Sequence, residues 1–315
     1  MSVLNGVQTP QIDTAADAVL DSFATGLAQA SRSPVLRTPA DAGLPYQEIS
    51  YPSSDGTPLE AWLIPCPGST RLVVAMHAFG MNRYGFPSHV EPWRSAFGPG
   101  NDTELDLLQD YRVLHDNGYT VLAFDFRNHG LSSAANGATA SNNRFEARDV
   151  LGTLEHVRAH PELGTMTLGL FARCMGANAT FRAIATDPGA FRDVRCLVAP
   201  LLLSPRAFVE AGLQRAGLGE HVDEVDRRFW LLTGERLDGG TVSAWAPSVT
   251  MPTLTYGVRD DVLTRPDDLA CAYAAIGAKD KDMFWIEDTP RRWDGYRWFQ
   301  RHPERVLEWL DAHMA

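Results

Sequence analysis

The chain has 315 residues, of which 44% are hydrophobic and 21% are charged, and its formal net charge at pH 7 is -11. This composition is typical of a globular protein with one large domain or two small ones. An acidic chain without a basic cluster is poorly suited to a phosphate backbone, so we expect no nucleic acid partner. Lys279 and Lys281 are the only lysines, which excludes a polybasic membrane patch.

The sequence contains no segment that predicts a membrane span, a metal site or a nucleotide site. No apolar run reaches transmembrane length, and the N-terminus has no secretory pattern, so we expect a cytoplasmic protein. The cysteines have no CxxC spacing, which argues against zinc and favours free thiols. Because no glycine-rich phosphate loop follows a strand, we expect no cofactor.

The first predicted element is a helix over residues 13–31, with a cap at Asp13 or Thr14. Two short strands follow at 46–51 and 59–64, on either side of a turn. Arg71–Met76 is almost continuously apolar, as expected of a strand that is buried on both faces.

After this strand, predicted helices and strands alternate along the chain. Strands are expected at 119–125, 166–171, 194–199, 252–257 and 282–287, and helices at 103–117, 143–159, 176–187, 266–276 and 303–313. The alternation predicts an α/β fold with a mostly parallel twisted sheet and helices on both faces. The segment 201–248 interrupts it and predicts a small helical lid. We therefore expect an N-terminal helical extension at 1–45 and one catalytic domain at 46–315.

The sharpest motif lies where strand 166–171 meets the next helix. There the sequence Ala172-Arg173-Cys174-Met175-Gly176 fits the nucleophile elbow G-x-S-x-G, with alanine replacing the first glycine and cysteine replacing serine. Small residues suit this motif because the turn is tight and the helix packs close to the strand. The alternative is that Cys174 is a buried structural thiol.

From about residue 46 to the end, the chain resembles the α/β-hydrolase superfamily, and a cysteine at the elbow resembles its dienelactone-hydrolase-like members. Met76-His77-Ala78-Phe79-Gly80 resembles the oxyanion loop of the family, and residues 125–132 resemble its D-x-R-G-H-G-x-S segment. The resemblance implies that the backbone N–H groups of Phe79 and Met175 form an oxyanion hole.

The resemblance also places the triad acid directly after strand 252–257. Asp260 is the candidate there and Asp261 the reserve. The alternative is that both are solvated carboxylates of a turn, where aspartate is common.

The family histidine is missing from its usual loop, which follows the last strand. This chain has Arg291 and Arg292 in that loop, and its later histidines lie too far along the chain. His77 and His129 lie in the two resembling motifs, where the family uses them mainly as structural residues. Each is a candidate for a substitute base.

A cysteine tolerates the loss of this histidine better than a serine does. A thiol at a helix N-terminus or beside cations ionises readily, and Arg173, Arg291 and Arg292 are the candidate cations. Without an acid–base residue, however, only good leaving groups would depart quickly and the acyl-enzyme would be hydrolysed slowly. Acyl transfer or cyclisation would then compete with hydrolysis.

Two functions remain open. The first is an enzyme that uses Cys174 covalently on a small activated acyl substrate (an ester, lactone or thioester, free or carrier-bound), as a hydrolase, acyltransferase or cyclase. The second is a non-hydrolytic lyase, dehydratase or cyclase, or a non-catalytic binding protein, that uses the oxyanion hole and the arginines. Candidate substrate-binding residues are Arg173, Tyr84, Trp230 and Trp245, although the aromatic residues would equally serve to pack the lid. The oligomeric state is left open.

Overall fold

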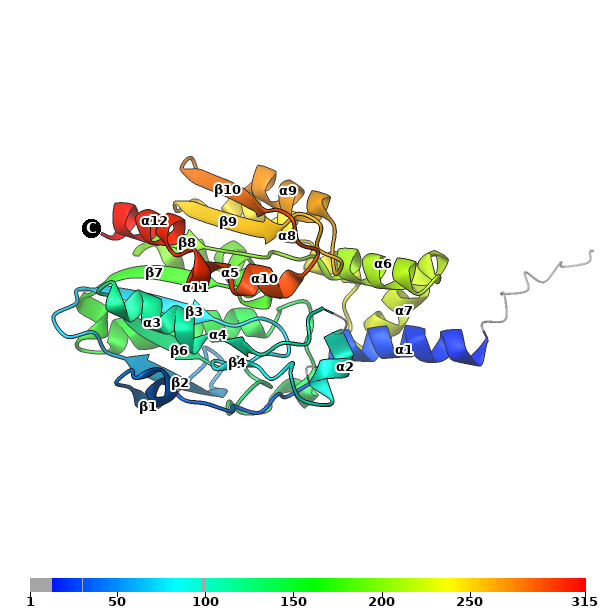
Figure 1. Ribbon diagram of the computed structural model, residues 1–315, viewed down its shortest axis with the longest axis horizontal. Coiled ribbons are helices and arrows are strands. Elements are labelled where there is room, and N and C mark those ends of the chain that lie inside the picture. Colours follow the sequence, from blue (N-terminus) through cyan, green and yellow to red (C-terminus); the bar gives the residue numbers. More distant parts are fainter. Residues whose placement is uncertain (1–12, 30, 98–99) are drawn as a thin grey trace, which may run out of the picture.

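The computed structural model describes residues 13–29, 31–97 and 100–315. Its centre is an eight-stranded sheet in the order β1-β2-β6-β3-β7-β8-β9-β10 (Figure 1). The strands are β1 (Gln47–Pro52), β2 (Pro58–Ile64), β3 (Arg71–Met76), β6 (Thr120–Phe124), β7 (Thr167–Ala172), β8 (Val194–Val198), β9 (Thr253–Val258) and β10 (Lys281–Ile286). β2 pairs antiparallel with β1 and β6, and the remaining pairs are parallel. The predicted mostly parallel sheet is confirmed.

Helices cover both faces of this sheet. The core cluster on one face includes α4 (Glu146–Ala159), α5 (Met175–Thr186), α8 (Val242–Trp245) and α9 (Pro266–Ala275). The cluster on the other includes α3 (Leu108–Asp116), α10 (Arg292–Tyr296), α11 (Trp298–Arg301) and α12 (Glu304–Met314). Along β3, Leu72 and Val74 belong to the first cluster and Val73 and Ala75 to the second, which explains why this strand is apolar throughout.

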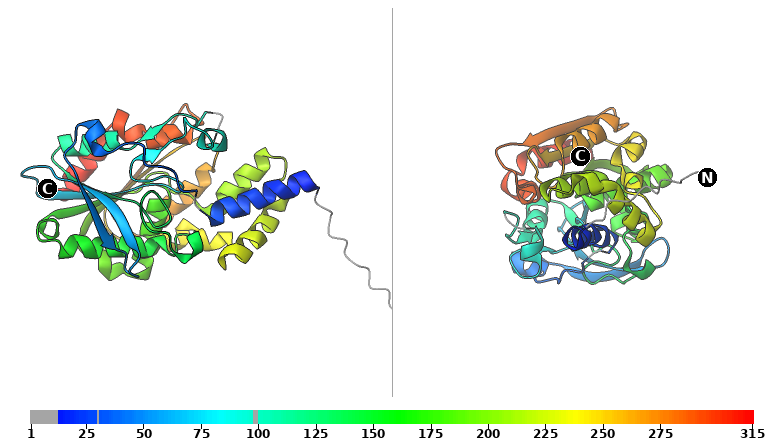
Figure 2. Two further views of the ribbon diagram at one scale, coloured as in Figure 1. Left: turned by 90° about the horizontal axis from the view of Figure 1, so that it is seen from below. Right: turned by 90° about the vertical axis from the view of Figure 1, so that its right-hand side faces the viewer.

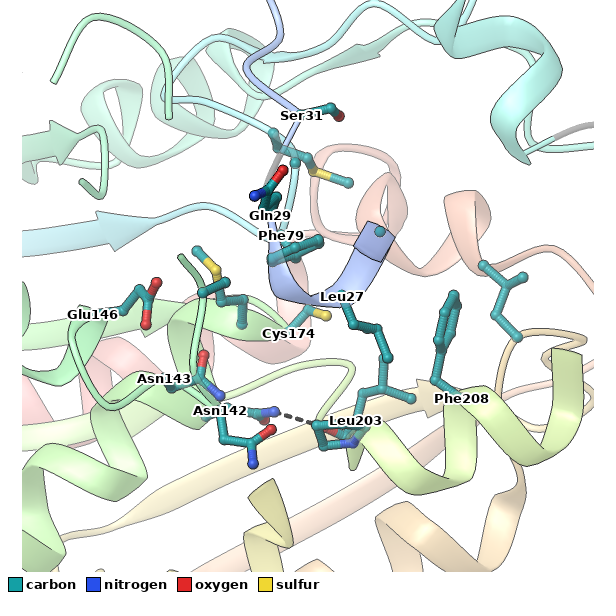
Figure 3. A pocket seen from close by; sticks show the side chains of 18 of the residues that line it. Leu27, Gln29, Ser31, Phe79, Asn142, Asn143, Glu146, Cys174, Leu203 and Phe208 are labelled. Atoms are coloured by element: carbon teal, nitrogen blue, oxygen red, sulfur yellow. Dashed lines mark hydrogen bonds between the residues drawn. The ribbon is translucent and has the colours of Figure 1, made fainter. Parts of the chain in front are cut away.

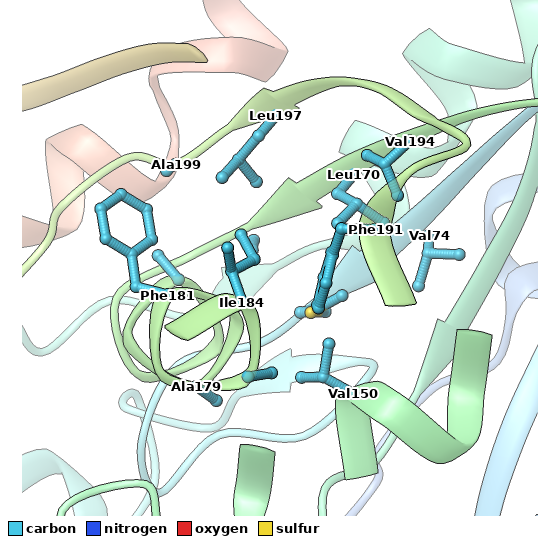
Figure 4. Packing of buried hydrophobic residues seen from close by; sticks show 14 of the residues in the cluster. Val74, Val150, Leu170, Ala179, Phe181, Ile184, Phe191, Val194, Leu197 and Ala199 are labelled. Atoms are coloured by element: carbon cyan, nitrogen blue, oxygen red, sulfur yellow. The ribbon is translucent and has the colours of Figure 1, made fainter. Parts of the chain in front are cut away.

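The packing of α5 illustrates how the first cluster is built. Figure 4 shows Ile184 of this helix between the sheet residues Leu197 and Leu170 and the α4 residue Val150, with Phe181 of the same helix to one side. All five side chains are buried. This contact holds α5, and therefore the turn before it, in a fixed position at the end of β7.

A helical insertion stands between β8 and β9, in the region predicted as a lid. It contains α6 (Pro205–Arg215), α7 (Val222–Thr233) and the short α8. The N-terminal helix α1 (Thr14–Ala28) lies beside α6 and α7 beyond one end of the sheet (Figures 1 and 2).

α1 is tied to the insertion by an apolar seam and by ion pairs. Leu20 and Ala24 are fully buried in a cluster that includes Val225 and Phe229 of α7. Arg228 of α7 also pairs with Asp17. α1 is therefore a third wall of the lid, whereas Ala42 and Leu44 of the expected 1–45 extension belong to the second core cluster of the sheet; residues 1–12 and 30 lie outside the described ranges.

Three further short elements lie at the end of the sheet that carries α1, and the sequence analysis did not predict them. β4 (Gly85–Phe86) and β5 (Leu105–Asp106) form a two-stranded sheet, and α2 (Trp93–Phe97) lies between them. Because residues 105–106 pair with 85–86, the helix expected from residue 103 begins at Leu108. In the described ranges, no helix has the length and apolar character needed to cross a membrane.

We predict that Gly176→Val lowers the free energy of unfolding by roughly 1–3 kcal/mol, because it overpacks the junction between α5 and β3. A Cβ at Gly176 would lie 2.8 Å from the Met76 Cβ and 2.9 Å from the His77 carbonyl oxygen. The measurement is urea unfolding followed by circular dichroism. Gly26→Ala in α1 is the control, since a Cβ there meets nothing within 4 Å. Equal stability of Gly176→Val and the unmodified chain would contradict this close approach.

Candidate active site

Cys174 occupies a sharp turn between β7 and α5. Its backbone has φ 49° and ψ -111°, a conformation that costs a non-glycine residue about 1–3 kcal/mol. Its N–H donates to the Pro200 carbonyl at 3.0 Å, which helps to hold the turn. The predicted elbow motif therefore folds as a strained strand-to-helix turn.

The side chain of Cys174 lines a cavity of about 480 Å³ between the sheet and the lid (Figure 3). Phe23 and Leu27 of α1, Phe208 of α6 and Phe229 of α7 supply its apolar wall. The described part of the N-terminal segment thus contributes directly to the site.

Arg292 lies in the cavity wall and is bound to three groups. It donates from Nη1 to Asp261 Oδ2 at 2.6 Å, from Nε to the Tyr296 hydroxyl at 3.2 Å, and from Nη2 to the Leu201 carbonyl. Only 3% of the Arg292 side chain and 2% of the Asp261 side chain are exposed. A buried ion pair therefore stands where the family resemblance places histidine and acid.

Tyr296 joins this ion pair to Cys174. Its oxygen accepts from Arg292, and its hydroxyl lies close to the Cys174 sulfur. Burial raises the pKa of Tyr296 well above its ordinary value, and Cys174 adds to this while Arg292 opposes it. Although burial disfavours the charge of Arg292, its pKa lies well above the usual value because of Tyr296, Cys174 and Asp261. Tyr296 is thus a neutral phenol beside the sulfur, and Arg292 is a cation.

The prediction of Asp260 as the acid does not fit the structure. Asp260 is exposed, whereas Asp261 turns inward and holds Arg292. Asp261 also accepts from the Leu263 N–H at 2.9 Å, which fixes the turn after β9. Arg291, the other arginine of the predicted pair, is exposed and does not line the cavity.

Phe79 and Met175, the predicted oxyanion-hole residues, both line the cavity next to Cys174. Met175 is the first residue of α5, where backbone N–H groups have no partner within the helix. No backbone carbonyl of the described residues accepts from either N–H. Both groups therefore remain available to a developing oxyanion.

His77 is bound on both ring nitrogens and is unsuited to the role of substitute base. Nδ1 lies 2.8 Å from the Ala78 carbonyl and must carry the proton, while Nε2 accepts the Phe126 N–H at 3.0 Å. Burial, followed by the neighbouring His129, lowers the pKa of His77 well below its usual value. Burial also lowers the pKa of His129 to about 4. Neither ring lines the cavity, so the prediction of His77 as a catalytic residue does not fit the structure.

Arg173 and Tyr84 are buried next to the site but point elsewhere. The Arg173 guanidinium is bound to Asp110, and the Tyr84 hydroxyl donates to Glu104. Neither residue lines the cavity, which contradicts their assignment as substrate-binding residues. The pairing with Asp110 explains the burial of Arg173, because a buried cation needs a counter-charge.

The two predicted lid tryptophans also lie outside the cavity. Trp230 is 44% exposed on the outer side of α7, with the Arg236 guanidinium over its ring. Trp245 packs against the core cluster beneath the lid and lies under Arg182. The two tryptophans therefore make packing and surface contacts. The apolar wall that the lid gives to the cavity is supplied by phenylalanines and Leu27 instead.

Two functional candidates were missed by the sequence analysis. Tyr296 lies one helical turn after Arg292, and that spacing on a helix was a usable signal. Glu146 begins α4 and lines the cavity with a buried carboxyl group. Nothing in its sequence context distinguishes it from an ordinary first-turn acid of a helix.

The described residues also contain no group of three or more His, Cys, Asp or Glu side chains that could hold a metal ion. All four cysteines are free thiols. Cys271 is exposed, and Cys196 is buried in the core.

The fold resembles that of several solved esterases and hydrolases. An esterase of Pyrococcus furiosus shares 20% identity, with a TM-score of 0.68 over 92% of this chain and 98% of that one. The α/β hydrolase GrgF of Penicillium shares 16% identity (TM-score 0.57; 86% and 99% covered), and a dienelactone hydrolase of Anabaena variabilis shares 14% (TM-score 0.54; 86% and 99% covered). No protein-family model and no curated protein matches the sequence. The chain has the α/β-hydrolase fold.

Proposed function

We propose that the protein is a hydrolase or acyltransferase that attacks an activated acyl group with Cys174. The observation that carries this proposal is the position of the Cys174 sulfur at the elbow, in the cavity and close to the Tyr296 hydroxyl. The esterases and hydrolases with the same fold support this chemistry.

In the first step, the Cys174 thiolate attacks the carbonyl carbon and a C–S bond forms. The Cys174 sulfur lies at the N-terminus of α5 and near the guanidinium of Arg292. The carbonyl oxygen becomes an oxyanion and receives the N–H groups of Phe79 and Met175.

In the second step, the bond to the leaving group breaks and Tyr296 acts as the acid. The leaving oxygen or sulfur takes the hydroxyl proton, and the resulting tyrosinate is stabilised by Arg292 at 3.2 Å. Asp261 holds Arg292 in place but exchanges no proton in this scheme. Arginine itself does not serve as an acid near neutral pH, because its pKa is too high.

In the third step, the tyrosinate takes a proton from water or from another acyl acceptor. The deprotonated acceptor then attacks the thioester carbon, and Cys174 leaves as a thiolate. Charge and protons balance, because Tyr296 regains the proton it lost. A neutral Tyr296 whose pKa is raised gives up its proton reluctantly, so poor leaving groups should depart slowly. This favours esters with acidic alcohols, lactones of enols, and thioesters.

We predict that Cys174→Ala lowers the rate of p-nitrophenyl ester cleavage by at least about a hundredfold and that Cys174→Ser retains only a trace, because a serine hydroxyl scarcely ionises without a base. Initial rates at saturating ester measure the loss. Cys271→Ala is the matched control, since that thiol is exposed and lies outside the cavity. Full activity of Cys174→Ala would exclude the covalent mechanism.

We also predict that Tyr296→Phe changes the dependence on the leaving group. The ring and its contact with Trp293 remain, but the acid is lost. Cleavage of an alkyl ester should fall by about ten- to a hundredfold, and that of a p-nitrophenyl ester by much less, because p-nitrophenolate departs without a proton. The ratio of the two kcat/KM values is the measurement.

Tyr84→Phe is the matched control for this experiment. It removes a hydroxyl that is bound to Glu104 and lies outside the cavity, so the ratio should stay unchanged. An equal loss for both esters in Tyr296→Phe would limit Tyr296 to a structural role.

A further inference from the structure

The wall of the cavity presents hydrogen-bond acceptors without partners. Both carboxylate oxygens of Glu146 and the side-chain oxygen of Asn178 are buried, and no other residue among those described donates to them. The Asn178 amide nitrogen is already used, since it donates to the Leu203 carbonyl at 2.6 Å. This bond fixes the amide orientation and leaves its oxygen as the unpaired atom.

These residues belong to the same cavity as Cys174. Glu146, Asn178 and the neighbouring Asn143 line it, and Glu146 and Asn143 lie on one side of Cys174 while Leu27 and Phe208 lie on the other (Figure 3). The cavity thus has an acceptor end and an apolar end, with the nucleophile between them. Unpaired buried acceptors are costly in a folded protein, so two of them in one cavity require a physical reason, and a bound donor supplies one.

No cation among the described residues compensates Glu146. Burial raises the pKa of its carboxyl to about 7, against the influence of its own backbone N–H; Asp149 raises it further, and Arg127 and Arg182 lower it. Both arginines have other carboxylate partners. Arg127 is bound to Asp149 and Asp55, and Arg182 is bound to Glu235.

We propose that the Glu146 carboxyl, with the Asn178 oxygen as a second unpaired acceptor in the wall of the same cavity, forms a subsite for a hydrogen-bond donor, an amino or hydroxyl group carried by the substrate. Such a group would supply the missing donors, and the apolar part of the substrate would lie against the phenylalanines of the lid. A protonated amine complements the carboxylate in charge as well, whereas a hydroxyl complements it only as a donor. The inference rests on the proposed function only in treating the ligand as an acyl compound.

The experiment measures binding rather than turnover. Calorimetry on Cys174→Ala compares hexanamide, 6-hydroxyhexanamide and 6-aminohexanamide, together with their four-carbon homologues. In the six-carbon series, the four-carbon series or both, an amide that ends in an amino or hydroxyl group should bind more tightly than the amide that ends in a methyl group. The expected difference is at least about tenfold. Glu146→Leu in the same background should abolish this preference, and Glu146→Gln should weaken it.

Glu155→Leu is the matched control, because Glu155 lies on the same helix with an exposed carboxylate. The pH distinguishes the two donors. Glu146 ionises as the pH rises through about 7, so the amino ligand should gain affinity from about pH 6 to about pH 8, while the hydroxyl ligand changes less.

The proposed subsite would be overturned if neither the amino nor the hydroxyl ligand bound more tightly than the methyl-terminated one. It would also be overturned if such a preference survived Glu146→Leu. Because Cys174 is absent from the variant used, a negative result leaves the proposed nucleophile untouched. Conversely, a loss of the covalent mechanism would leave the binding result valid.

Discussion

The arrangement of the site depends on one buried ion pair, between Arg292 and Asp261. Two charges with almost no exposed surface are expensive to bury, and they are retained only where geometry and further hydrogen bonds compensate. Here the Leu201 carbonyl and the Tyr296 hydroxyl satisfy the guanidinium. The loss of either charge would strand the other in the core, so the pair fixes α10 against the end of β9.

This constraint has a chemical consequence. A guanidinium cannot exchange protons as an imidazole does, but it can hold a hydroxyl and stabilise its anion. In the proposed mechanism the proton-transferring group is therefore Tyr296, which lies between Arg292 and Cys174. A cysteine suits such a site better than a serine, because its thiolate forms without a base.

The sheet could be predicted well from the sequence, because strands that are buried on both faces read as apolar runs between amphipathic helices. Arg71–Met76 and the other parallel strands were placed within one or two residues of their observed bounds. The elbow was equally readable, since few local structures require small residues around a nucleophile-type residue after a strand.

The side-chain partners in the site were less predictable, because they depend on long-range contacts. Asp260 and Asp261 are adjacent, and only the fold decides which one turns inward. Arg173 is next to Cys174 in sequence, yet Asp110 draws it away from the cavity. The unpaired carboxyl of Glu146 could not be anticipated, because its burial arises from elements distant in the chain.

The most direct test of the central claim is intact mass spectrometry of the protein after brief exposure to an acyl thioester, with mapping of the modified residue. Because Tyr296 is a weak acid–base residue, acylation should outrun deacylation. We therefore expect one acyl group per chain to accumulate on Cys174. A folded protein that forms no adduct and releases no thiol would contradict the account, and so would rapid turnover without any adduct, since it would require a stronger base than Tyr296.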